Sequence, residues 1–364
     1  MLPPLAYLAW AIENYGLVKY DLATSGMPNL AAERVGPPAE LLARATDVSA
    51  PALWVQAIAR RFGVASASVV PTLGTTHGLW ATYAALLSPG DDVVVESPAY
   101  EPLVRLAEGL GARVVSFARP LSRGAALDPA AIERAITTKT RLVAITNLHN
   151  PTGAYAPDEV IESVAAVTRR AGVPLLVDEV YRDLVDYDPT RGRTAFHLGA
   201  GIVTTSSLTK VYGLGWARAG WVLAEPHLAK RIFDATLHTA GGTSYALASI
   251  GAIALDRIAD LYAISAQQRA GDDALAARLS AFVAARPNLS WSRAPGSIFG
   301  FVVDRRGVDL RAAIERAIRQ EQVIVAPGVF FGAPSGFRIR YGALPIELLD
   351  EGLARLGRAL DRAP

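Results

Sequence analysis

Short apolar runs alternate with helical patterns through the middle of the chain. Residues 157–171, for example, carry Val160, Ile161, Val164 and Val167 at helical spacing. Apolar strands separated by helices are typical of a mostly parallel sheet that helices cover on both faces. Ligands of such sheets bind beyond the carboxyl ends of the strands, so functional residues are expected there. The predicted strands are residues 92–96, 112–117, 142–145, 175–177, 202–204 and 220–224.

The pattern changes after about residue 240. A long helical stretch without a strand is followed by a smaller segment of mixed strands and helices. We therefore predict two domains in an α/β fold, a large one covered by helices and a smaller α+β one. The helical stretch is residues 246–285, the later strands are 299–303 and 337–341, and the later helix is 310–320. The predicted domains are 31–245 for the large one, and 1–30 with 246–364 for the small one.

Composition narrows the class of protein. The 364 residues are 51% hydrophobic and 19% charged, which fits a well-packed globular protein. Charged residues, Gly or Pro interrupt every apolar run before 18 residues, so we expect no membrane span, and the N-terminus lacks a signal-peptide pattern. We therefore expect a cytoplasmic protein. A formal charge of +2 with interspersed signs gives no basic stripe, so no nucleic-acid partner is expected.

The absence of cysteine and the spacing of the histidines limit the catalytic and metal-binding chemistry that the chain can perform. It has no cysteine, which excludes disulfides and thiolate catalysis. Its five histidines show no i, i+4 pair, so a zinc site of the usual spacing is not expected.

One lysine occupies an unusual position. Only four of the 36 basic residues are lysine, and Lys210 follows an apolar strand and the hydroxyl cluster 204–207. Lysine can lose its proton and act as a base or form a Schiff base, whereas arginine cannot. The alternative is an ordinary solvated lysine in a loop.

Polar residues follow other strand ends as well. Asp178 comes directly after residues 175–177, where it could also be a helix N-cap. Asn150-Pro151-Thr152-Gly153 follows another strand and could be a plain turn. Gly74-Thr75-Thr76 opens a helix in a way that suits an anion at a helix N-terminus. Ser207, Thr209 and Arg218 place further phosphate-binding groups around Lys210.

In this order and spacing, these motifs resemble those of the class I/II aminotransferases of fold type I, the aspartate aminotransferase superfamily of pyridoxal phosphate (PLP) enzymes. The resemblance covers residues 74 to 340, and residues 22–28 match the family's N-terminal segment weakly. It implies a seven-stranded, mostly parallel sheet in the large domain. The motifs are Gly74-Thr75-Thr76, Ser97-Pro98-Ala99-Tyr100, Asn150-Pro151-Thr152-Gly153, Asp178-Glu179-Val180-Tyr181, Ser207-x-x-Lys210-x-x-Gly213 with Arg218, Ala326-Pro327-Gly328-x-Phe330, and Phe337-Arg338-Ile339.

The resemblance also implies a role for each residue. Lys210 forms the internal aldimine with PLP, and Asp178 keeps the pyridine nitrogen protonated, as a nearby carboxylate does. Tyr181, counted with these two as catalytic, and Asn150 bind the ring 3′-oxygen, and Tyr100 stacks on the ring. The phosphate site is Gly74, Thr75, Thr76, Ser207, Thr209 and Arg218. Arg338 is expected to bind the substrate α-carboxylate, with Gly26 as a second substrate-binding residue.

Three positions depart from the family pattern. Trp216 stands where a glycine is frequent, at a wall near the phosphate or at the domain interface. The segment 46–51 lacks the tyrosine that reaches the neighbouring subunit's phosphate, and either Tyr15 or Tyr20 could replace it. No arginine can be assigned to a side-chain carboxylate of the substrate. Arg340, two residues after Arg338, is expected on the opposite side of a strand, solvated or structural.

The resemblance favours reversible transamination between an L-amino acid and a 2-oxo acid by a homodimer. The alternative within the same fold is a β-elimination, a decarboxylation or a cyclisation, as in capreomycidine synthase-like proteins. A ligand-sensing regulator is disfavoured because no N-terminal helix-turn-helix is present. The interpretation as a nicotinamide dehydrogenase is less favoured still, since Gly213-Leu214-Gly215 lacks the rest of the dinucleotide fingerprint.

Overall fold

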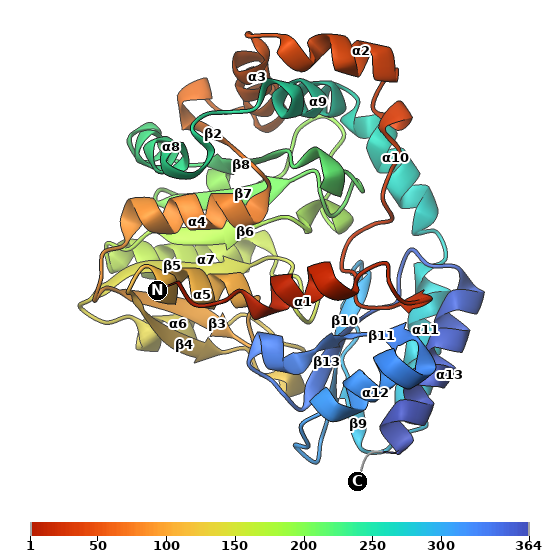
Figure 1. Cartoon of the computed structure of the whole chain (residues 1–364). Coiled ribbons are helices and arrows are strands. Elements are labelled where there is room, and N and C mark those ends of the chain that lie inside the picture. Colours follow the sequence, from red (N-terminus) through yellow and green to blue (C-terminus); the bar gives the residue numbers. More distant parts are fainter. Residues whose placement is uncertain (1, 363–364) are drawn as a thin grey trace.

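A seven-stranded sheet forms the centre of the computed structural model, which describes residues 2–362 (Figure 1). The strand order is β2-β8-β7-β6-β5-β3-β4, and β8 runs antiparallel to both of its neighbours while the other pairs are parallel. The predicted α/β fold with a mostly parallel seven-stranded sheet is therefore confirmed. The strands are β2 (Val69–Thr72), β3 (Asp92–Ser97), β4 (Arg113–Ala118), β5 (Thr140–Thr146), β6 (Leu175–Asp178), β7 (Ile202–Ser207) and β8 (Gly220–Leu223).

One strand of this sheet escaped the sequence analysis. β2 has four residues and contains Pro71, which has no N–H to give to a ladder. Proline is tolerated at a sheet edge, and β2 is the edge strand beside β8.

Helices cover both faces of the sheet because its strands are apolar on both sides. In β3, Val93 and Val95 pack with Leu79 and Leu103 on one face, whereas Val94 packs with Ile161 on the other. The first face is covered by α4 (Thr75–Leu86), α5 (Glu101–Gly109) and α8 (Pro226–Ala240), and the second by α6 (Pro129–Ala135) and α7 (Asp158–Arg170).

Local sequence explains where these helices begin and end. Asp158 and Glu159 lie in the first turn of α7 and Arg169 and Arg170 in its last, which complements the helix dipole. α5 begins only at residue 101, directly after the Ser97-Pro98-Ala99-Tyr100 motif. The N-cap Tyr100 is extended, and the Ala99 N–H donates to the Phe331 carbonyl at 3.1 Å.

The second part of the chain is built around a four-stranded antiparallel sheet of order β12-β13-β10-β9. A separate parallel pair joins β1 to β11, and so ties the N-terminal segment to this region. The predicted elements at residues 299–303, 310–320 and 337–341 are confirmed as β10, α12 and β13. The bounds are β1 (Tyr20–Asp21), β9 (Leu289–Trp291), β10 (Phe299–Asp304), α12 (Arg311–Glu321), β11 (Val323–Ile324), β12 (Ala326–Pro327), β13 (Gly336–Arg340) and α13 (Ile346–Asp361).

The stretch 246–285 is helical, as predicted, but it is broken into three helices. α9 (Tyr245–Asp256) packs on α3 (Ala50–Phe62) beside the large sheet, whereas α11 (Asp272–Ala284) packs on α13. The chain passes from one part to the other through α10 (Ile258–Gln268), so the domain boundary at residue 245 stays a prediction.

Two further helices belong to the N-terminal segment, α1 (Ala6–Asn14) and α2 (Pro38–Ala43). Figure 1 shows α1 in front of the junction between the large sheet and the C-terminal strands β10 and β13. Across residues 2–362, no helix combines the length and the apolarity that a membrane crossing requires.

Candidate active site

A cavity of about 630 Å³ lies at the carboxyl ends of β5, β6 and β7. This is the edge of the sheet where ligands were expected. Three of the predicted residues, Gly26, Gly74 and Arg338, lie behind the cavity surface. Ten others line it together: Thr75, Thr76, Tyr100, Asn150, Asp178, Tyr181, Ser207, Thr209, Lys210 and Arg218.

Lys210 lies just after β7, half-buried with its side chain against the cavity. Burial lowers the pKa of its amine; the Tyr7 hydroxyl opposes that shift, and the Arg338 cation adds to it. The backbone around it is fixed, since Met27 N–H donates to the Lys210 carbonyl at 2.7 Å. A Cβ on Gly26 would come within 3.2 Å of Lys210 Cδ, so glycine at residue 26 leaves room for the lysine chain.

Asp178 is the buried last residue of β6. Burial raises the pKa of its carboxyl to about 7, and the nearby Glu96 and Glu179 carboxylates act in the same direction. Its Oδ1 accepts the Val180 N–H at 3.1 Å, and within residues 2–362 its Oδ2 receives no hydrogen bond. A cation in the cavity would therefore be stabilised by this carboxylate.

An anion cradle lies at the N-terminus of α4. The N-cap Gly74 has φ +85°, a conformation that favours glycine, and a Cβ there would lie 2.6 Å from Arg218 Nη2 and displace that guanidinium. Arg218 Nη2 donates to the Leu73 carbonyl at 2.9 Å, and Thr75 Oγ1 donates to Ser207 Oγ at 3.1 Å.

The buried hydroxyl of Thr209 in this cradle has no partner among the described residues. A helix N-terminus, a guanidinium, two further hydroxyls and this unsatisfied one suit a phosphate group. These residues therefore fit the phosphate end of PLP.

The remaining predicted cofactor contacts are held in place by hydrogen bonds to other residues of the cavity wall. Tyr181 donates to Ser25 Oγ at 2.7 Å, and the Asn150 N–H donates to Thr146 Oγ1 at 2.9 Å. The buried Glu96 accepts from both the N–H and the hydroxyl of Thr146, at 2.8 and 2.6 Å. Tyr100 lies with its hydroxyl 3.4 Å from Thr76 Oγ1.

The two arginines of β13 lie on opposite sides of the strand, and both are buried. Arg338 Nη1 donates to Asn150 Oδ1 at 2.9 Å, so it reaches the cavity through that residue. Arg340 donates to the carbonyls of Gly26 and Ala343, both at 3.3 Å. It is therefore structural and not solvated.

Sequence analysis missed the wall of the cavity that α1 supplies. Its side chains come from Tyr7, Leu8, Ala11, Ile12 and, just after the helix, Tyr15. An apolar helical pattern at residues 6–14 could have predicted the helix, but not what it packs against. Ser25, His77 and Thr146 also line the cavity and were not predicted.

The structure shows where the residues that depart from the family pattern lie. Trp216 Nε1 donates to the Leu30 carbonyl at 2.8 Å, which ties it to the N-terminal segment. Tyr15 lines the cavity. Tyr20 lies in β1, and its ring centroid is 4.9 Å from the guanidinium carbon of Arg355.

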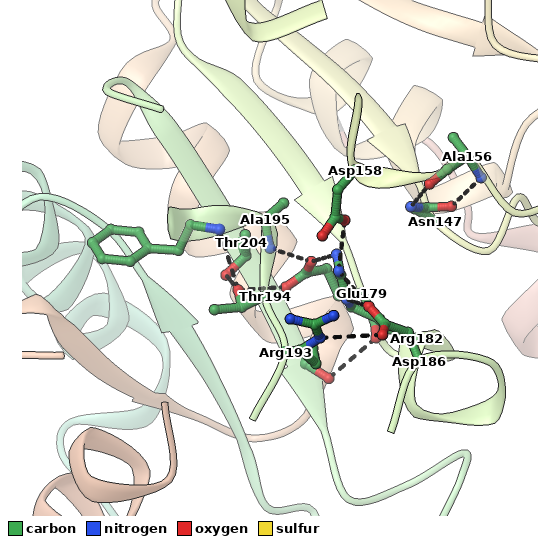
Figure 2. Close-up of polar contacts among 12 residues, drawn as sticks. Asn147, Ala156, Asp158, Glu179, Arg182, Asp186, Arg193, Thr194, Ala195 and Thr204 are labelled. Atoms are coloured by element: carbon green, nitrogen blue, oxygen red, sulfur yellow. Dashed lines mark hydrogen bonds and ion pairs between the residues drawn. The ribbon is translucent and has the colours of Figure 1, made fainter. Parts of the chain in front are cut away.

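A network of charged side chains lies behind the end of β6 (Figure 2). Glu179 accepts from Thr194 Oγ1 at 2.7 Å and from Arg182 Nη1 at 3.1 Å. The buried Arg182 also pairs with Asp158 at 2.7 Å and with Asp186 at 2.6 Å. This network fixes the turn that carries the site residues at 178 and 181.

The chain matches the family model for aminotransferase class I and II over residues 42–356. An aspartate aminotransferase from Streptomyces avermitilis is 27% identical over 322 residues, which cover 83% of this chain and 76% of that protein. A capreomycidine synthase from Streptomyces vinaceus is 27% identical over 384 aligned residues, covering 99% of this chain and 94% of that protein. The crystal structure of a PLP-dependent aminotransferase from Streptococcus suis superposes with a TM-score of 0.86 at 21% identity, covering 99% of this chain and 98% of that one.

The family model spans most of the chain, and the cavity holds the lysine, carboxylate and anion cradle that PLP requires. The chain therefore belongs to the class I and II aminotransferases, PLP-dependent enzymes of fold type I.

Proposed function

We propose that the chain moves an amino group between an L-amino acid and a 2-oxo acid, with Lys210 as the group that transfers the proton. The observation that carries this proposal is the meeting of Lys210, Asp178 and the α4 anion cradle in one cavity, with Arg338 directly behind Asn150. No other lysine lines this cavity among the described residues.

Three groups of residues would hold the cofactor. The backbone N–H groups at the start of α4, with Ser207, Thr209 and Arg218, would bind the phosphate. Asp178 would pair with the protonated ring nitrogen, and Asn150 and Tyr181 would bind the 3′-oxygen. When bound, PLP supplies an electron sink for the electron pair that is released at the substrate Cα.

Lys210 would take the proton from the substrate Cα and then deliver it to the cofactor side of the bond that joins substrate and cofactor. Its lowered pKa favours the neutral amine that can accept a proton. A positioned base of this kind contributes typically about 10²–10⁴-fold to the rate.

The other wall would select and orient the substrate. Arg338 presents a planar guanidinium, which binds an α-carboxylate in a fixed orientation. Leu8, Ala11 and Ile12 offer an apolar surface to the side chain. We therefore infer that amino acids with uncharged side chains are preferred over aspartate and glutamate.

Half-reactions test the proposal. Holoenzyme mixed with single amino acids, without a 2-oxo acid, should convert its cofactor to the amine form, which changes the absorbance. Borohydride reduction and peptide mapping should place the cofactor on Lys210. A label on Lys19, Lys139 or Lys230 would contradict the assignment.

A second candidate function is a cyclisation or an elimination in the same cavity. The similarity to the capreomycidine synthase covers 99% of this chain and therefore includes α1, whereas the aspartate aminotransferase covers 83%. Both reactions need the same lysine, carboxylate and phosphate site. Product analysis of the half-reactions separates them, since only transamination yields a 2-oxo acid with the amine form of the cofactor.

We also propose that the chain works as a homodimer. Exposed apolar side chains concentrate in its first 50 residues: Ile12 is 83% exposed, Leu17 75%, Leu42 76% and Val48 77%. Burial of this surface in a partner would remove it from water. Sedimentation equilibrium should give twice the chain mass, and a monomer at micromolar concentration would contradict the proposal.

A further inference from the structure

Tyr7 of α1 joins the N-terminal helix to Arg338, the arginine proposed to bind the substrate α-carboxylate. Arg338 Nη2 donates to the Tyr7 hydroxyl at 2.6 Å, and the guanidinium carbon lies 5.3 Å from the centroid of the Tyr7 ring. The Tyr7 backbone N–H donates to Glu101 Oε2 at 2.6 Å, which anchors α1 to the start of α5. Its ring packs between Phe330 and Phe331, with centroids 5.8 and 5.6 Å away. The hydroxyl is therefore held in place from several sides.

Three of the five guanidinium hydrogens of Arg338 are used within the protein, one of them, on Nη1, by Asn150 Oδ1. Both hydrogens of Nη2 are used, one by the Tyr7 hydroxyl and one by the Ala23 carbonyl at 2.9 Å. The buried Nε–H has no partner among the described residues. A carboxylate that binds Arg338 through two bonds therefore lies next to, or in place of, the Tyr7 oxygen.

The Tyr7 proton has a defined direction. Arg338 can only donate, so the Tyr7 oxygen accepts from it and keeps its own hydrogen for another acceptor. The nearest oxygen is the Tyr15 hydroxyl at 2.9 Å, which itself donates to the Ala23 carbonyl at 3.2 Å. The Tyr7 hydrogen thus points to Tyr15 in the free site and can rotate toward a carboxylate.

The charges around Tyr7 favour an anion beside it. The residue lines the same cavity as Lys210. Burial by itself would raise the pKa of Tyr7, but the cations of Arg338 and Lys210 outweigh it and the pKa is lowered. A hydroxyl polarised in this way is a strong hydrogen-bond donor.

We propose that Tyr7 is a substrate-binding residue, which donates its hydroxyl proton to the α-carboxylate that Arg338 holds. The inference rests on the proposed function, because it assumes an amino-acid substrate at Arg338. It assigns to α1 a contact with the group that all amino acids share, in addition to the apolar contacts with their side chains.

The test compares two ligands that differ by this group. L-Phenylalanine and 2-phenylethylamine are titrated into the holoenzyme, and binding is followed by the change in cofactor absorbance. In Tyr7→Phe, which keeps the packed ring, the dissociation constant for L-phenylalanine should rise about tenfold, as expected for one hydrogen bond to a charged group. That for 2-phenylethylamine should change by less than about twofold. Tyr155→Phe is the matched control, because its hydroxyl lies outside this cavity, 3.4 Å from Asp186 Oδ2.

The outcomes separate the two proposals. Equal weakening of both ligands, or no weakening of either, would overturn the role of Tyr7 while transamination stands. Wild-type protein that responds to neither L-phenylalanine nor L-alanine would overturn the proposed function itself, and the role of Tyr7 with it. Circular dichroism of Tyr7→Phe checks that α1 and the fold persist. If they do not, Tyr7→His is tested instead, because it keeps a hydrogen-bond donor and should discriminate between the two ligands. Failure of Tyr7→His to discriminate counts against the proposal.

Discussion

The two walls of the cavity are built in different ways. The cofactor wall consists of strand ends and the N-terminus of α4. Two of its groups, the Thr209 hydroxyl and Asp178 Oδ2, have no hydrogen-bond partner within residues 2–362. The proposed substrate wall is α1, with Arg338 of β13, more than 300 residues away, buried behind it. The Tyr7 hydroxyl and both Nη groups of Arg338 are already paired inside the protein. The cofactor wall thus has open groups for a ligand, whereas a substrate bound at the proposed substrate wall would have to replace internal hydrogen bonds.

The largest effect is expected at the cofactor wall. Lys210→Ala removes the proposed proton carrier, and turnover in the half-reaction should fall by about 10²–10⁴-fold from the loss of general-base catalysis. The borohydride-stable label should disappear as well. Lys230→Ala is the control, because Lys230 is exposed and pairs with Asp234 on the surface of α8. Normal turnover in Lys210→Ala would contradict the assignment of Lys210 as the base of the cofactor wall.

The network behind the cofactor wall should affect stability more than binding. Arg182→Met leaves Glu179 buried without its cationic partner, which should cost about 3–5 kcal/mol in the free energy of unfolding. Urea denaturation of the two proteins measures the difference. Arg193→Met removes an exposed partner of Asp186 and should cost less than about 1 kcal/mol. Similar losses in both variants would show that the network does not hold the turn.

The substrate wall is tested by the two arginines of β13. Arg338→Lys loses the planar fork, and the apparent affinity for an amino acid should fall by about 10–100-fold while the cofactor stays bound. Arg340→Lys makes the same change on the other side of the strand, so it should lower stability and change affinity by less than about threefold. Titrations of the cofactor absorbance report both affinities. Equal effects of the two substitutions on affinity would contradict a specific role of Arg338 in substrate binding.

The last prediction concerns the pH dependence of stability. The folded-state pKa of Asp178, about 7, is raised above its ordinary value of 3.8 by burial, so cofactor-free folded protein binds a proton that the unfolded chain has lost. Its free energy of unfolding should therefore fall by on the order of 1 kcal/mol per pH unit between about pH 4 and pH 7 from this group.

Asp178→Asn cannot titrate and should lack this contribution. Denaturant titrations of the two cofactor-free proteins at pH 5 and pH 7 isolate it, since other groups cancel in the difference. A parallel pH dependence in both proteins would contradict the shift. Bound cofactor should reduce the effect, because a protonated ring nitrogen favours the charged carboxylate.

The cofactor wall could be predicted almost residue by residue. Asp178 and Ser207 are the last residues of parallel strands, and Asn150 and Lys210 follow such strands closely, so the sheet alone brings them to one edge. The role of Arg338 followed from family resemblance, but its pairing with Tyr7 did not, because 331 residues separate the two. Edge strand β2 was missed because a proline stands in a run of only four residues.

The sequence by itself determined the α/β fold, the family, the dependence on PLP and the residues at the ends of the parallel strands, because strand order and local motifs place those groups without reference to distant segments. Only the tertiary structure decided what covers the substrate side: that α1 forms its wall, that Tyr7 reaches Arg338, and that Arg340 is buried. The physical reason is that an apolar helix or a buried arginine can be satisfied by many partners, and packing of the whole chain selects one of them.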